Sequence, residues 1–199
     1  MRSETWFKLA FGVAFAFAAT VAAITARQAT RRHGGPLNQL THEVRGLVFI
    51  RAALGLVFYF ALMLWLFWPR TVAWSYFRAP MALRWAAVVL LVPVLAFFAW
   101  SFRTLGTNYR GGVGLYDGHE LVVVGPYRWI RHPIYAAFIG IMLLVTLLSA
   151  NWVLGLAGLL LVTSIAVIRI PVEEGELHER FGQEWERYRA RTGRMMPRL

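Results

Sequence analysis

The stretch PIYAAFIGIMLLVTLLSANWVLGLAGLLLVTSIAVI, residues 133–168, predicts two apolar helices joined by a very short turn. Each half approaches the roughly 20 helical residues that are needed to cross the hydrocarbon core of a bilayer. Only Ser149–Asn151 separates the two halves. We therefore expect helices at 133–150 and 152–168 that form a tight antiparallel hairpin.

Three more apolar segments precede this hairpin, at about 6–26, 46–68 and 81–102, and Pro93 lies inside the third. Hydrophobic residues make up 58% of the chain and charged residues only 16%, whereas soluble domains carry about 25% charge. We expect an all-α integral membrane protein with about five transmembrane helices. The first segment could instead be a cleaved signal peptide. Its length and the arginines that follow it favour a retained helix.

Arginines account for most of the net charge of +11, and they cluster after the first, third and fifth apolar segments. Basic residues concentrate in cytoplasmic connections, so this pattern predicts an outside N-terminus and a cytoplasmic C-terminus in the cell membrane, which in a bacterium is the inner membrane. Clusters between apolar runs favour anionic headgroups over nucleic acid. The chain has no cysteine, which excludes disulfides and thiolate chemistry.

The tail from 172 to 199 has a different character. Leu177, Phe181, Trp185 and Tyr188 recur at helical spacing, with charged residues between them. This pattern predicts a cytoplasmic amphipathic helix that lies on the bilayer or on the inner face of the bundle. We expect one integrated domain, in which 1–102 supplies three transmembrane helices and 103–199 supplies a loop, the hairpin and this helix.

Polar side chains concentrate in GPYRWIRHPIY, residues 125–135, immediately before the hairpin. Pro133 suits the first turn of a helix, where its missing N–H costs nothing. The arginines and the histidine beside that helix end would make a basic pocket for a carboxylate. The aromatic residues and arginines equally suit simple anchoring in lipid headgroups.

A second polar group follows the hairpin, where Glu173 and Glu174 come four and five residues after Arg169. Hairpin geometry should return them to the level of Arg131 and His132. Carboxylates at that depth are costly unless they are paired or face a wet cavity. They could hold an amine or a sulfonium, or Glu173 could simply pair with Arg169 one helical turn away.

Other classes of site find little support in the sequence. The histidines show no metal-ligand spacing, and GGVG is not a dinucleotide fingerprint. We expect no metal. The aliphatic run at 121–124 could line an adenine pocket or pack on lipid.

The two motifs HELVVVGPYRWIRHPIY (119–135) and EEGELHERFGQEWERY (173–188) together resemble the isoprenylcysteine carboxyl methyltransferase (ICMT) family of membrane enzymes. The resemblance covers about 103–197, and the family is also similar to the phospholipid N-methyltransferases. It implies that S-adenosylmethionine binds at the cytoplasmic face without a Rossmann fold. The implied cofactor contacts are His119, Glu120, Leu121, Val122, Gly125, Tyr127, Arg131, His132, Pro133, Ile134, Tyr135, Glu173 and Glu174.

The resemblance also implies catalytic roles for Arg169, which would orient the acceptor group, and for Glu173. Two positions depart from the family pattern: Gly112 replaces a polar cofactor contact, and Ala137 replaces a common glycine. The expected reaction is methyl transfer to a lipophilic small molecule or lipid, with carboxyl O-methylation favoured. The alternatives are amine methylation of phospholipids, a sterol-reductase type of enzyme that uses a nicotinamide cofactor, and a non-catalytic membrane protein. No obligate protein partner is evident.

Overall fold

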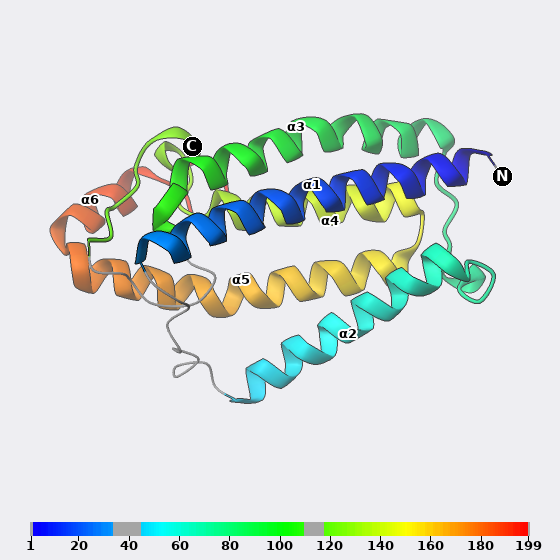
Figure 1. Cartoon of the computed structure of the whole chain (residues 1–199), viewed down its shortest axis with the longest axis horizontal. Coiled ribbons are helices and arrows are strands. Elements are labelled where there is room, and N and C mark those ends of the chain that lie inside the picture. Colours follow the sequence, from blue (N-terminus) through cyan, green and yellow to red (C-terminus); the bar gives the residue numbers. More distant parts are fainter. Residues whose placement is uncertain (1, 34–44, 110–117, 199) are drawn as a thin grey trace. The chain divides into compact units, whose positions relative to one another are not determined.

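The computed structural model describes residues 2–33, 45–109 and 118–198, and this part of the chain is helical (Figure 1). Its extended pairing is confined to two isolated bridges, and the expected all-α class is confirmed. The α-helices are α1 (Arg2–His33), α2 (Arg45–Phe67), α3 (Met81–Leu105), α4 (Pro133–Ser149), α5 (Trp152–Phe181) and α6 (Gln183–Arg191). Three short 3-10 helices are η1 (Ala73–Ser75), η2 (Gly106–Asn108) and η3 (Gly125–Arg128).

Four of these helices are long and apolar enough to cross a membrane, judged by length and composition. The spans are Ser3–Arg32, Phe49–Phe67, Met81–Asn108 and Trp152–Phe181, and α4 adds a shorter apolar helix of 17 residues. Many large apolar side chains on them are exposed, among them Phe49 at 73% and Val92 at 68%. Such surfaces suit lipid contact. The protein is a multi-pass membrane protein with about the number of spanning helices that we expected.

The chain divides into two compact units. Unit 1 comprises Met1–Phe17, Val44–Leu95 and Phe138–Ile165. Unit 2 comprises Ala18–Glu43, Ala96–Ala137 and Ala166–Leu199. All of the site residues that the sequence predicts lie in unit 2.

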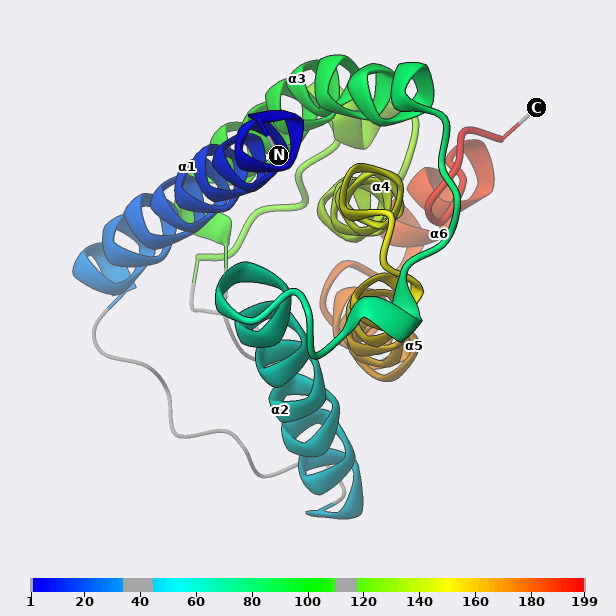
Figure 2. The same ribbon diagram turned by 90° about the vertical axis from the view of Figure 1, so that its right-hand side faces the viewer.

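The hairpin of α4 and α5 in unit 1 confirms the prediction (Figure 2). Its connection turns at Ala150, whose φ is +49°. Asn151 accepts a hydrogen bond at Oδ1 from Leu154 N (2.9 Å) and so caps α5, while its Nδ2 donates to Ser75 Oγ (2.6 Å). A Cβ added at Gly155 would lie 2.2 Å from Thr146 Oγ1. Glycine therefore allows the two helices to approach closely.

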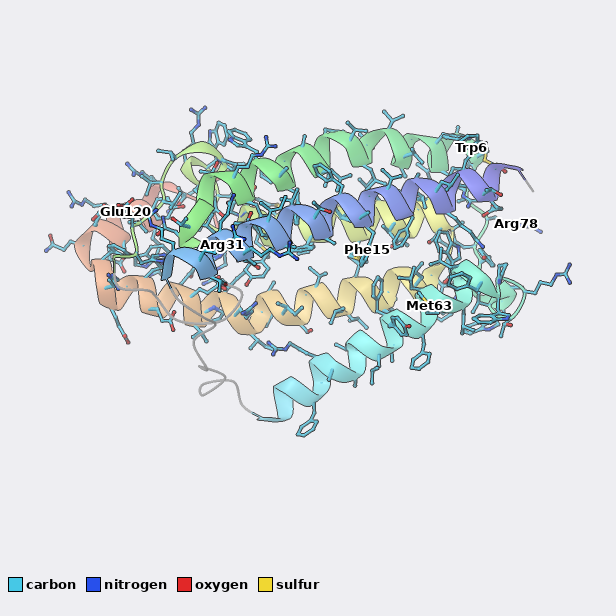
Figure 3. The ribbon with its side chains drawn as sticks, viewed as in Figure 1. Trp6, Phe15, Arg31, Met63, Arg78 and Glu120 are labelled. Carbon is cyan, nitrogen blue, oxygen red and sulfur yellow. The ribbon has the colours of Figure 1, made fainter. Side chains whose placement is uncertain are left out.

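A buried charge ties α1 to α3 and α4 in unit 1. Arg84 donates to both carboxylate oxygens of Glu4 (2.5 and 2.9 Å) and, through Nε, to Leu148 O (3.0 Å). Its guanidinium also lies 4.0 Å from the ring centroid of Phe7. The side chain of Arg84 is only 8% exposed. Figure 3 shows Trp6 and Arg78 at this end of the unit, where α1 begins.

Glu4→Gln is expected to lower the free energy of unfolding by about 3 kcal/mol, because it leaves a buried guanidinium without its counter-charge. Chemical denaturation in detergent micelles measures the loss. Arg78→Gln, a change at an exposed position of the same unit, should cost less than about 0.5 kcal/mol. Equal losses in the two variants would refute the role of the Glu4–Arg84 pair.

In unit 2, the prediction of a separate tail helix is wrong in its boundary. α5 does not end near residue 168 but continues through Pro171 to Phe181, and only Gly182 breaks it. Gly182 has a φ of +49°, a conformation that favours glycine. The change from apolar to charged residues near residue 168 alters which solvent the helix faces, but it does not end the helix. The break therefore falls later, at Gly182, inside the predicted tail helix. The predicted apolar face does pack inward: Trp185 and Tyr188 on α6 are 1% and 3% exposed.

Candidate functional site

The segment before α4 begins with a turn that only glycine fits. Gly125 has a φ of +57°, and a Cβ there would lie 2.8 Å from Thr104 Oγ1 and 3.3 Å from Trp100 Nε1 on α3. Trp129 then packs edge-on against Trp100, with ring centroids 6.0 Å apart. Gly125, a predicted cofactor contact, is therefore required for the turn that packs this segment against α3. Pro133 opens α4, as the sequence predicts.

The C-terminal segment Thr192–Arg194, here termed the strap, pairs with the backbone of residues 129–132. Arg131 N donates to Gly193 O (2.9 Å), His132 N donates to Arg194 O (2.9 Å), and Gly193 N donates to Trp129 O (3.1 Å). These bonds fix the backbone of the two predicted site residues. The strap could not be predicted from the sequence, because a backbone pairing between segments about sixty residues apart requires no particular pattern of side chains.

Glu174 is enclosed by three cationic or potentially cationic groups. Its carboxylate accepts from Arg131 Nε (2.9 Å) and Arg194 Nη2 (2.7 Å), and it lies 3.2 Å from His132 Nε2. The Glu174 side chain is 9% exposed. Arg131 also donates through Nη1 to the carbonyl of Thr192 in the strap. This cluster joins α5, the segment before α4 and the strap.

The neighbouring Glu173 has a different environment. Its Oε1 accepts from the hydroxyl of Tyr135 (2.8 Å), and its Oε2 lies 3.6 Å from His132 Nδ1. The Glu173 side chain is 28% exposed. His132 therefore stands between the two carboxylates, and its ring can donate to both only when both nitrogens carry protons. The expected approach of Arg131 and His132 to the two glutamates is confirmed.

Three tyrosines in unit 2 interact with Glu173: Tyr135 through its hydrogen bond, and Tyr109 and Tyr127 through the glutamate charge. Burial, followed by the nearby Tyr188 hydroxyl and the Glu173 charge, raises the pKa of Tyr127 well above its usual value. Burial also raises the pKa of Tyr109, while the charge of Arg169 lowers it and that of Glu173 raises it. Arg169 and Glu173 thus act on the same hydroxyl. The group consists of neutral hydroxyl donors, one cation and one accessible carboxylate.

The remaining predicted residues lie just before η3 and in the first turn of α4. His119, Leu121 and Val122 are half-buried, whereas Glu120 is exposed (Figure 3) and its backbone N donates to Asn108 Oδ1 (3.2 Å). Ile134 is half-buried in the first turn of α4. Ala137, where the resemblance favoured glycine, is 3% exposed and fills its place in the packing. Gly112, the other departure, lies outside the described residues.

Comparison with known proteins finds a family that the region around the site resembles. Residues 83–179 match the model of the isoprenylcysteine carboxyl methyltransferase (ICMT) family. This region, 97 of the 199 residues, is therefore similar to the ICMT family. The matched segment contains Arg131, His132, Glu173 and Glu174 and ends before α6 and the strap.

Two similar proteins extend the comparison. The uncharacterized protein YpbQ of Bacillus subtilis (strain 168) is 33% identical over 94 residues, which are 47% of this chain and 55% of YpbQ. This chain therefore spans about half the length of that relative. The solved structure of the eukaryotic intramembrane Ras methyltransferase ICMT matches with a TM-score of 0.55 at 20% identity, covering 92% of this chain and 66% of that one. The likeness shows that the two share a fold.

Gly193→Ala is expected to displace the strap and lower the free energy of unfolding by about 2 kcal/mol. A Cβ at this position would lie 1.7 Å from Met196 O, so the backbone must move. Gly175→Ala, which has open space within α5, should instead add about 0.5–1 kcal/mol because alanine favours the helix. Denaturant titration of both variants measures the opposite signs. A Gly193→Ala protein as stable as the parent would show that the strap is dispensable.

Proposed function

We propose that this protein transfers a methyl group from S-adenosylmethionine to the carboxylate of a lipophilic acceptor at the cytoplasmic face of a membrane. The observation that carries the proposal is the difference in environment between the adjacent residues Glu173 and Glu174. Glu174 is enclosed by Arg131, His132 and Arg194. Glu173 is left partly exposed beside Arg169 and a group of tyrosines.

The residues in this site fit a sulfonium cofactor. An accessible carboxylate can balance the sulfonium charge, as Glu173 would, and neutral tyrosine hydroxyls can donate to its polar groups. The half-buried aliphatic residues Leu121 and Val122 suit the adenine ring. S-adenosylmethionine, when bound, supplies an activated methyl group. The chain's own residues then have mainly to position both reactants and exclude water.

Arg169 supplies the feature that favours a carboxylate acceptor. A guanidinium presents a fork of donors that matches a carboxylate in geometry and charge. A carboxylate oxygen is already deprotonated at neutral pH, so its attack on the methyl carbon requires no base. With the cofactor held by Glu173 and the tyrosines, this oxygen would take the methyl group, and the sulfonium would be converted to a neutral thioether.

An amine acceptor would require a residue to remove a proton. Glu173 is the candidate base, but its two oxygens already face Tyr135 and His132 at 2.8 and 3.6 Å. A base at this position would have to give up one of these contacts to accept a proton. A carboxylate acceptor is therefore better supported than an amine acceptor.

A methyl-transfer screen tests the proposal. The protein in nanodiscs is incubated with methyl-labelled cofactor and either lipophilic acids, such as prenylated cysteine and fatty acids, or phosphatidylethanolamine. We expect base-labile labelled esters from an acid, and a loss of about 100-fold or more in Glu173→Gln. Glu179→Gln, an exposed change on the same helix, should retain activity. Stable N-methyl products, or no product from any acceptor, would overturn the proposed reaction.

A further inference from the structure

Four arginines line a hollow beside α6 in unit 2, and we call this the basic hollow. It has a volume of about 310 Å³. Three separate segments supply its lining: Arg131 precedes α4, Arg189 lies on α6, and Arg194 and Arg198 follow α6. Glu186, Ala190 and the strap residues Thr192 and Gly193 complete the lining.

The charges around the basic hollow do not cancel. Glu174 pairs with both Arg131 and Arg194, and Glu186 lies 3.5 Å from Arg189. Glu186 also lies 3.0 Å from Nδ1 of His178. Four guanidinium groups thus face two carboxylates, which leaves two positive charges. A ligand that carries two negative charges would balance them.

The arginines are also held in place. Arg131 Nη1 donates to the carbonyl of Arg189 (3.2 Å), and Arg198 Nη1 donates to the carbonyl of Ala190 (2.5 Å), both in the last turn of α6. These bonds cap the helix, which is a structural role in its own right. A guanidinium has five N–H donors, and the cap on Ala190 uses one of those of Arg198. Arg131 keeps the two donors of Nη2, because its Nε and Nη1 bind Glu174, Arg189 and Thr192. Side chains fixed in this way lose little entropy when they bind a ligand.

We propose that the basic hollow binds a phosphate monoester, carried either by a lipid headgroup or by a soluble molecule. A monoester phosphate carries about 1.5–2 negative charges near neutral pH, which matches the excess of two positive charges. Arginine forks also bind phosphate oxygens in pairs. A phosphodiester or a carboxylate, with one charge, would balance only half of the excess.

The basic hollow shares Arg131 with the predicted cofactor contacts, but its test does not depend on the proposed methyl transfer. The two arginines chosen for its test, Arg189 and Arg198, lie beyond the ICMT-family segment, which ends at residue 179. Neither has a place in the proposed cofactor or acceptor site. Failure of one proposal is therefore distinguishable from failure of the other.

Native mass spectrometry of the purified full chain tests the proposal with phosphatidic acid, phosphatidylglycerol and phosphatidylcholine, and calorimetry adds inorganic phosphate. The double variant Arg189→Gln/Arg198→Gln should retain at least fivefold less phosphatidic acid than the parent. The control Arg187→Gln/Arg191→Gln removes the same charge from another face of α6. It should change retention less than twofold, and thermal melts confirm that both variants fold.

The lipid-retention measurement and the calorimetry with inorganic phosphate together identify the source of the phosphate. Loss of phosphatidic acid in the first variant alone assigns the basic hollow to a lipid monoester. Variant-dependent binding of inorganic phosphate without lipid retention assigns it to a soluble monoester. Three results would overturn the proposal: equal losses in both variants, phosphatidylglycerol retained as well as phosphatidic acid, or no binding of either probe.

Discussion

Glu174→Ala is expected to lower the free energy of unfolding by about 3–5 kcal/mol, the usual cost of breaking a buried ion pair. The Glu174 side chain is 9% exposed and accepts from Arg131 and Arg194 at 2.9 and 2.7 Å. Its removal leaves Arg131 charged in a site where that guanidinium is also 9% exposed. It also releases Arg194, and with it one attachment of the strap. Denaturant titration in detergent micelles measures the loss.

A matched control lies on the same helix. Glu179 is exposed, so Glu179→Ala should change the free energy of unfolding by less than about 0.5 kcal/mol. Glu174→Gln preserves the shape but not the charge and should fall between the two. If Glu174→Ala unfolds at the same denaturant concentration as Glu179→Ala, the contacts of Glu174 with Arg131, Arg194 and His132 do not stabilise the fold.

Arg169→Ala is expected to reduce methyl transfer by about 10²–10³-fold while leaving the affinity for the cofactor product S-adenosylhomocysteine within about threefold. This prediction rests on the proposed function, in which Arg169 aligns the acceptor carboxylate and Glu173 holds the cofactor. The two residues are separable because they lie one helical turn apart on α5. Turnover with a lipophilic acid and calorimetry with S-adenosylhomocysteine give the two readouts.

Arg169→Lys tests whether the charge of Arg169 or its planar fork of donors aligns the acceptor carboxylate. Lysine keeps the positive charge but lacks the planar fork of donors, so activity should recover only in part. Cofactor affinity lost together with turnover in Arg169→Ala would contradict the acceptor role. It would place Arg169 in the cofactor site instead.

Much of the fold could be predicted because a membrane restricts the alternatives. A run of apolar residues as long as 133–168 must form helices in a bilayer, where each backbone group needs an internal partner. The short turn at Ser149–Asn151 then forces the hairpin. The same geometry brings Glu173 and Glu174 back to the level of His132, and the structure confirms their approach.

The features that could not be predicted depend on contacts between distant segments. Glu4 and Arg84 are separate charges in the sequence, and only packing makes them a pair. The strap depends on backbone hydrogen bonds, to which almost any residue type can contribute. The length of α5 was underestimated because charged residues after residue 168 change the exposure of a helix without ending it.

The adjacent glutamates show how structure separates residues that the sequence treats alike. Both match the same family motif, and residue type gave them equal claims to a cofactor. One helical step turns their side chains by about 100°. Glu174 is enclosed by Arg131, His132 and Arg194, whereas Glu173 meets Tyr135 and remains 28% exposed.

Calorimetric titration of the purified protein with S-adenosylmethionine, whose sulfonium charge Glu173 would balance, tests the central claim most directly, because it requires no knowledge of the acceptor. The account predicts saturable binding of one molecule per chain, weakened about tenfold or more in Glu173→Gln and unchanged in Glu179→Gln. The absence of binding by the folded parent protein, or equal affinity in all three proteins, would contradict it.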